Sequence, residues 1–194
     1  TAGKIEDLIL GEWSPKEVYR RLKDVKPIFT GAYILVGEPG MSKLEGVLTC
    51  IENIRRGLPR LVQNWGPSLE LAWRDLKTQD HMGGFTSYEA ISDIRWTPVL
   101  NQASDIMTWC NAGPGAARGL GWLTTDNPQR FTCSPSNQKM MLELMRELLD
   151  MSKDEKYWPK EYQPFEMREV EHWLCEHDKM MRSYGGQAMK RRYS

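Results

Sequence analysis

Apolar side chains recur along much of this chain every three or four residues, a spacing that places them on one side of an α-helix. Residues 136–152 show the pattern most clearly, with an apolar stripe of Met140, Met141, Leu144, Met145, Leu148 and Leu149. Residues 165–182 repeat it with Val170, Trp173, Leu174, His177 and Met181. Such stripes normally face the core, so both segments are predicted to be packed helices rather than methionine-lined binding grooves.

Helix start signals divide the rest of the chain. A Ser or Thr that precedes Pro or a helix-forming run is suited to cap a helix N-terminus. These signals predict helices over residues 16–26, 42–57, 68–75 and 99–109. Two further helices are predicted over residues 83–96 and after the turn at residues 113–115, and residues 126–136 are the best loop.

One segment favours β-structure, at residues 29–36, and it has no obvious partner strand. The predicted fold class is therefore all-α. With 194 residues, of which 40% are hydrophobic and 27% charged, the chain fits a single domain over residues 1–194. It contains no apolar run of the roughly 18 residues needed to span a membrane, and its first residues do not resemble a signal peptide.

Cysteine usage indicates a reducing compartment, because the four cysteines show no paired spacing typical of zinc ribbons or disulfide frameworks. His172, Cys175 and His177 are potential metal ligands, but all three lie on one predicted helix without partners elsewhere. A thiol between two ordinary histidines is the preferred interpretation. We therefore expect no metal and no cofactor.

The overall charge does not by itself indicate a binding partner. The formal net charge is zero, whereas proteins that hold DNA by its phosphates usually carry a basic excess. A local patch is sufficient, and Arg55-Arg56 with Arg60 and the terminal 190–193 segment are candidates. Solvated surface is the commoner explanation for both segments.

Residues 111–120 contain a Gly-Pro-Gly turn, at Gly113, Pro114 and Gly115, placed between two predicted helices. The exposed amides of a helix that starts at such a turn suit a phosphate. The pattern is similar to the hairpin of helix-hairpin-helix DNA-binding proteins, although a structural turn is about as plausible. It is not a phosphate-binding Walker loop, because no Gly-Lys-Ser/Thr follows.

Residues 83–96 and 165–182 carry the other candidate chemistry. On the first helix, Phe85, Glu89 and Asp93 share one side, where an aromatic ring and carboxylates could stack a base and accept a proton. The alternative is a half-buried helix with an acidic edge. On the second, a charged face is formed by Arg168, His172, Glu176 and Lys179, flanked by Glu171 and Arg182. It could hold anions and move a proton, or be a ladder of surface ion pairs.

Several motifs occur in a specific order: Phe29-Thr30-Gly31-Ala32-Tyr33; Gly84-Phe85, Tyr88-Glu89 and Asp93-Ile94-Arg95; Trp109, Gly113-Pro114-Gly115-Ala116 and Arg118-Gly119-Leu120; and Met167-Arg168-Glu169-Val170-Glu171-His172, Leu174-Cys175-Glu176 and Asp178-Lys179. With Gly185-Gly186 and Arg192-Tyr193, they resemble the alpha-glutamyl/putrescinyl thymine pyrophosphorylase family. These amino acid:DNA transferases are related to the helical domain of 5-hydroxymethyluracil DNA kinases. The resemblance covers residues 28–193 and leaves 1–27 as an N-terminal helical extension. The chain departs from the family pattern at Trp173, His177 and Met180.

The resemblance implies a phage-type DNA hypermodification enzyme, with an all-helical fold similar to helix-hairpin-helix DNA glycosylases. Such an enzyme replaces the pyrophosphate of an activated 5-hydroxymethyluracil with an amine. Its partners would be double-stranded DNA with modified pyrimidines and an amino acid or polyamine donor, in the cytoplasm of a bacterial host cell. Activation would come from another protein, since the chain has no kinase P-loop. The donor and the oligomeric state stay open.

Base chemistry of this kind requires nucleotide flipping. Tyr33, Phe85 or Tyr88 would stack the base near Glu89, and Gly113, Pro114, Gly115 and Arg118 would hold backbone phosphate. Arg168, Lys179 and Arg182 would stabilise the leaving pyrophosphate, and the proton acceptor would be Asp93, Glu171, His172 or Glu176. The alternative is a DNA glycosylase that uses Asp93 or Asp178 to stabilise an oxocarbenium-like sugar. A catalytically silent reader of modified DNA is a third class.

Overall fold

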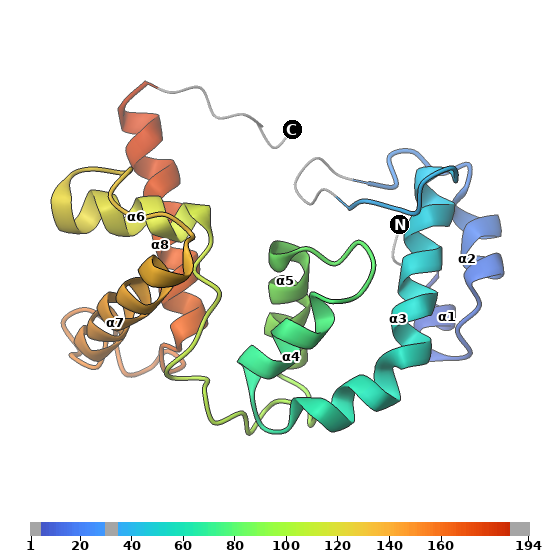
Figure 1. Ribbon diagram of the computed structural model, residues 1–194, viewed down its shortest axis with the longest axis horizontal. Coiled ribbons are helices and arrows are strands. Elements are labelled where there is room, and N and C mark those ends of the chain that lie inside the picture. Colours follow the sequence, from blue (N-terminus) through green and yellow to red (C-terminus); the bar gives the residue numbers. More distant parts are fainter. Residues whose placement is uncertain (1–4, 30–34, 187–194) are drawn as a thin grey trace.

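The computed structural model describes residues 5–29 and 35–186. Within these ranges the chain forms helices and no strand, so the all-α prediction is confirmed (Figure 1). The helices are α1 (Glu6–Leu10), α2 (Pro15–Leu22), α3 (Lys43–Trp65), α4 (Leu69–Leu76), α5 (Gly84–Ile94), α6 (Pro114–Thr125), α7 (Pro135–Met151) and α8 (Met167–Tyr184). None of the helices in the described ranges is long and apolar enough to cross a membrane.

Two predicted features lie mainly outside the described residues. The predicted β-segment, residues 29–36, falls largely there, together with Tyr33. The part of it that is described at its C-terminal end, residues 35–36, is not a strand. The basic segment at residues 190–193 also lies beyond the described ranges.

Helix α3 is longer than predicted and connects two apolar clusters. It begins with the predicted Ser42 cap, which forms a capping box with Glu45, but it continues past Gly57 to Trp65. The prediction that it ends near Gly57 is wrong, because the C-terminal half buries Leu61 and Trp65 in the main core. That burial offsets the cost of Pro59, which lacks an N–H group. Figure 1 shows the helix bending along this half.

The smaller cluster packs α2 against the N-terminal half of α3. Its buried members are Val18, Leu22, Leu44 and Leu48. As predicted, Ser14 caps α2 ahead of a first-turn proline, with its hydroxyl accepting a hydrogen bond from the amide of Glu17. This cluster fixes the N-terminal helices on one end of α3, away from the α6–α8 end of the molecule (Figure 1).

Residues 99–109 do not form the predicted helix. They run as successive turns, and the segment that leads directly into α6 is irregular. The Asp105 carboxylate accepts hydrogen bonds from the Ser68 hydroxyl at 2.8 Å and from the amides of Leu69 and Glu70 at 2.8 and 3.0 Å. Asp105, although far along the chain, thus caps the N-terminus of α4. The turns over residues 99–109 place its carboxylate there, in place of a continuous helix. The Gly113–Gly115 turn therefore follows an irregular segment, not a helix.

Within the main core, the backbones of α6 and α8 approach each other closely at Gly119. A Cβ atom on Gly119 would lie 2.2 Å from the backbone oxygen of Leu174, so only glycine permits this approach. Leu120 and Leu174 are fully buried beside it. The predicted stripe of α7 faces inward at Met141, Met145 and Leu149, which are buried, whereas Met140 is 43% exposed and does not belong to the buried side.

The buried side of α8 differs from the predicted stripe. It is formed by Met167, Val170, Glu171, Leu174 and Asp178. Trp173 is instead 46% exposed and stacks on His177, with ring centroids 5.4 Å apart. The apolar pattern placed Trp173 and His177 inward because it treats carboxylates as solvated, and here two carboxylates are buried with polar partners.

Candidate functional site

Glu171 is buried where α8 meets the start of α6. Its side chain is 7% exposed. One carboxylate oxygen accepts a hydrogen bond from the Cys175 thiol at 3.3 Å, one helical turn further along. The same oxygen would lie 3.8 Å from a Cβ atom on Gly113, and the Gly113 amide interacts with the carboxylate. The acid therefore sits against the Gly-Pro-Gly turn.

Burial raises the pKa of Glu171 to about 7. The Cys175 thiol and the Gly113 amide oppose the change by favouring the charged form, whereas the nearby charge of Glu89 adds to it. A carboxyl group of this kind is divided between its protonated and ionised forms near neutral pH. It can both accept and return a proton under physiological conditions.

His172 lies between two carboxylates from different helices. Its Nε2 is 3.7 Å from a Glu171 oxygen and 3.8 Å from a Glu89 oxygen on α5. Burial, and then the charge of Arg168, lower the pKa of His172, while Glu89 raises it. The imidazole is therefore mainly neutral at pH 7. Glu89, Glu171 and His172 form an acid–base cluster in which the imidazole lies just beyond hydrogen-bonding distance of both carboxylates.

Arg168 supplies a cation at the buried edge of this cluster. It pairs with Glu169 at 3.1 Å, while its Nε atom is buried without a hydrogen-bond partner in the described part of the chain. Tyr88 is 5% exposed, packs edge-on against Trp109 and has a hydroxyl with no partner among the described residues. Burial raises the pKa of this tyrosine well above its ordinary value. Both side chains line one small cavity.

Cys175 was not among the predicted site residues, although its position four residues after Glu171 places it on the same helical face. Burial, followed by the charge of Glu171, raises the pKa of its thiol far above the ordinary value. Since the thiolate is the nucleophilic form, Cys175 is not set up as a nucleophile at neutral pH. Its part in the site is to hydrogen-bond Glu171.

Asp178 and Arg118 bind each other. Asp178 is 1% exposed and accepts hydrogen bonds from Arg118 at 2.8–3.1 Å and from Arg182 at 3.1 Å. The Arg118 contacts join α6 to α8, next to the close approach of the two helices at Gly119, whereas Arg182 lies on α8 itself. Three residues expected in catalysis, DNA contact and substrate binding thus form one ion-pair cluster, and their proposed functional roles remain predictions.

The remaining predicted residues lie nearer the surface. Glu176 and Lys179 form an ion pair with side chains 68% and 46% exposed, so they are on a different face from Glu171. Phe85 is 58% exposed at the start of α5, and Asp93 is exposed near its end. The structure thus brings together Tyr88, Glu89, Arg168, Glu171 and His172 with the Gly113 turn.

The raised pKa of Glu171 predicts a specific dependence of stability on pH. The folded protein binds this proton more tightly than the unfolded chain, whose ordinary value is 4.5. The resulting stability is present below pH 4.5 and is lost as the pH rises to about 7. We expect the free energy of unfolding of the wild type to fall by about 3 kcal/mol over this window relative to Glu171→Gln. Urea unfolding of both proteins at pH 5 and pH 8 measures it, and parallel pH profiles would contradict the assignment.

These features describe an all-helical protein with an acid–base cluster around the buried Glu171, where α5, α6 and α8 meet. Residues 6–189 match the family model described as "5-hmdU DNA kinase, helical domain", and the chain belongs to that family. The matched range includes α1 and α2 as well as the helices of the main core. No curated protein and no solved structure matches the chain.

Proposed function

We propose that this protein acts in thymine hypermodification of DNA, as a transferase that replaces the pyrophosphate of an activated 5-hydroxymethyluracil with an amine. The amine would come from an amino acid or a polyamine. Membership of the 5-hmdU DNA kinase helical-domain family supports the link to modified DNA. The observation that carries the reaction is Glu171, a buried carboxyl group whose pKa is raised to about 7.

The proposed reaction needs a proton acceptor. An amine donor reaches the site mainly as an ammonium ion, which has no free electron pair. Transfer of one proton from it to the Glu171 carboxylate frees the nitrogen to attack the exocyclic CH₂ of the base. The new C–N bond forms as the C–O bond to pyrophosphate breaks, and pyrophosphate leaves with that electron pair. His172, beside Glu171, would pass the proton on toward Glu89.

The residues proposed to contact the leaving group and the DNA lie around the same acid–base cluster. Arg168 lies close enough to the acid–base cluster for its charge to lower the pKa of His172, and it would stabilise the departing pyrophosphate. The exposed ring of Phe85, on the same helix as Glu89, is the proposed stacking surface for a flipped base. The Gly113–Gly115 turn, which already contacts Glu171, would approach the DNA backbone. Because the chain lacks a Walker motif, activation of the base is assigned to another domain or protein.

Nucleoside analysis tests the proposal directly. The protein would be incubated with double-stranded DNA that contains pyrophosphorylated 5-hydroxymethyluracil, together with a pool of amino acids and polyamines. Digestion to nucleosides and mass spectrometry should reveal a new, heavier nucleoside in intact DNA, with release of pyrophosphate. Abasic sites and free base would show a glycosylase instead, and binding without any product would show a reader. Either result would overturn the transferase proposal.

A further inference from the structure

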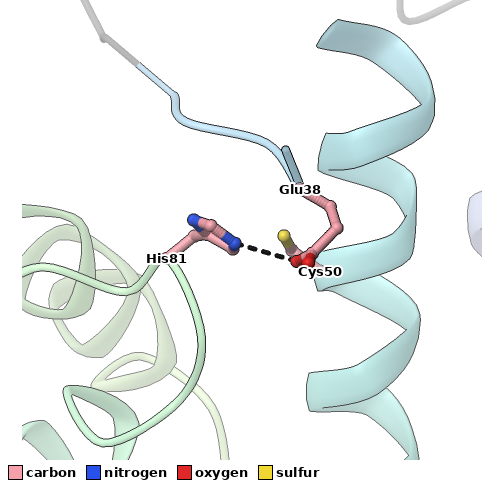
Figure 2. Close-up of side chains that lie close together, drawn as sticks. All are labelled: Glu38, Cys50 and His81. Atoms are coloured by element: carbon pink, nitrogen blue, oxygen red, sulfur yellow. Dashed lines mark hydrogen bonds and ion pairs between the residues drawn. The ribbon is translucent and has the colours of Figure 1, made fainter. Parts of the chain in front are cut away.

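Three side chains with metal-binding chemistry converge beside α3, outside the acid–base cluster. The Glu38 carboxylate, the Cys50 thiol and the His81 imidazole have one ligand atom each, and these atoms all lie within 4.8 Å of one another. His81 Nε2 is 2.9 Å from a Glu38 oxygen. Figure 2 shows the three side chains pointing toward a common centre from three separate segments. Within the described residues, no other such group of ligands occurs.

The backbone around this cluster is closely packed. A Cβ atom on Gly46 of α3 would lie 2.5 Å from the Glu38 amide nitrogen, and one on Gly37 would lie 2.9 Å from the Gly46 backbone. The segment carrying Glu38 therefore lies directly on α3, one helical turn before Cys50. His81 reaches the same point from the loop between α4 and α5.

We propose that Glu38, Cys50 and His81 bind one zinc ion. Cysteine thiolate, imidazole nitrogen and carboxylate oxygen are the ligand types that zinc takes in proteins. Around a tetrahedral zinc, with bonds of about 2.0–2.3 Å, ligand atoms lie about 3.3–3.8 Å apart. No separation here exceeds 4.8 Å, so the ligand atoms need to approach one another by at most about 1–1.5 Å, which side-chain rotation provides. A water molecule would complete the coordination, since three protein ligands leave one position open.

Charge and burial at this point agree with a cation. Cys50 is 8% exposed, and the carboxylates of Glu38 and Asp80 lie close enough to act on its thiol electrostatically. A zinc ion would bind the thiolate, release the thiol proton to solvent and balance the carboxylate. Zinc would replace the direct contact of His81 Nε2 with Glu38, now 2.9 Å, by bonds from both groups to the ion. The ion would tie the α4–α5 loop and the Glu38 segment to α3.

This site is independent of the proposed transferase chemistry. None of its three residues belongs to the acid–base cluster, and α4 and α5 lie between α3 and α8 in Figure 1. Local sequence does not predict this site, since Glu38, Cys50 and His81 are scattered and match no metal-binding spacing. Failure of one proposal leaves the other intact.

Cobalt(II) titration of the metal-free full-length protein tests the zinc site. We expect binding of one Co²⁺ per chain, with visible ligand-field bands and a near-ultraviolet thiolate-to-cobalt charge-transfer band, all lost when Zn²⁺ is added. Cys50→Ser should abolish the charge-transfer band. His81→Asn should weaken Co²⁺ and Zn²⁺ binding at least about tenfold, given that even outer-shell changes cost 10–100-fold. Asn suits the variant because His81 has a φ of 62°, a left-handed conformation that Asn adopts readily.

Matched controls use residues outside the cluster. Cys133→Ser removes an exposed thiol, and His177→Asn removes a histidine that stacks on Trp173. Both should bind cobalt as the wild type does, and circular dichroism should show native helix content in all four variants. The proposal is overturned if the wild type binds no stoichiometric Co²⁺ or if Cys50→Ser keeps the charge-transfer band. It is also overturned if His81→Asn binds as tightly as the wild type, or if Cys133→Ser loses the signal.

Discussion

Replacing Glu171 with Gln is expected to reduce amine transfer to modified DNA by about 10²–10⁴-fold, the usual contribution of a positioned acid–base group. Gln has nearly the same size and can still accept hydrogen bonds from the Gly113 amide and the Cys175 thiol, but it cannot take the ammonium proton. Single-turnover rates, measured by nucleoside mass spectrometry, report the effect. The activity of the wild type should also rise with pH around 7, where Glu171 ionises, and the residual activity of the variant should lack this rise.

The matched control is Glu147→Gln. Glu147 is exposed on α7, so the same chemical change there should leave the transfer rate unchanged. We expect Glu171→Gln to stay folded, because it no longer carries a charge in a buried position. Urea unfolding of the variant distinguishes a loss of catalysis from a loss of folded protein. A folded Glu171→Gln protein with wild-type turnover would show that Glu171 takes no part in the reaction.

Replacing Asp178 with Asn is expected to lower the free energy of unfolding by about 3 kcal/mol. Removal of one member of a buried ion pair typically costs about 3–5 kcal/mol, because it leaves a charge without its partner. Here the cost falls at the lower end, since the Arg118 and Arg182 side chains are 35% and 27% exposed and keep some water. In a domain of this size, 3 kcal/mol corresponds to a fall in Tm of about 6–12 °C.

Asp150→Asn is the control for this change. Asp150 also pairs with a basic residue, Lys153, but both side chains are more than two-thirds exposed, so its loss should change stability by less than about 0.5 kcal/mol. Urea unfolding of the three proteins gives the comparison. If Asp178→Asn unfolds like Asp150→Asn, the Arg118–Asp178–Arg182 cluster does not hold α6 to α8.

Together, the two variants separate the acidic residues of α8 by function. Glu171 and Asp178 lie on the same buried side of the helix, but burial raises the pKa of Glu171, whereas Asp178 forms ion pairs with two arginines. We therefore expect Glu171→Gln to affect turnover with little loss of stability, and Asp178→Asn to affect stability first. Glu176, on the exposed face, belongs to neither group.

Much of the fold could be predicted from local sequence. The caps at Ser14, Ser42 and Ser68 start helices where expected, because a side-chain hydroxyl next to free amides is a short-range effect. Met141 and Met145 of α7 face the core, because burying one apolar side of a helix removes that side from water. The extension of α3 past Gly57 and the missing helix at 99–109 were not predictable in this way. Both depend on partners far along the chain, namely the main core for Trp65 and the N-terminus of α4 for Asp105.

The sequence by itself determined that this is an all-helical chain, where most of its helices begin, and that α8 carries an unusual mixture of acids, bases and a thiol. Only the tertiary structure decided which of these groups are buried. An argument from helical periodicity assigns apolar side chains to the buried side and charged ones to the exposed side. It therefore predicted a buried Trp173 and exposed carboxylates. The close contact of α6 with α8, set by Gly119, buries Glu171 and Asp178 with partners that local sequence does not show, and that burial raises the pKa of Glu171. The same reasoning applies to Glu38, Cys50 and His81, which only the packing on α3 brings together.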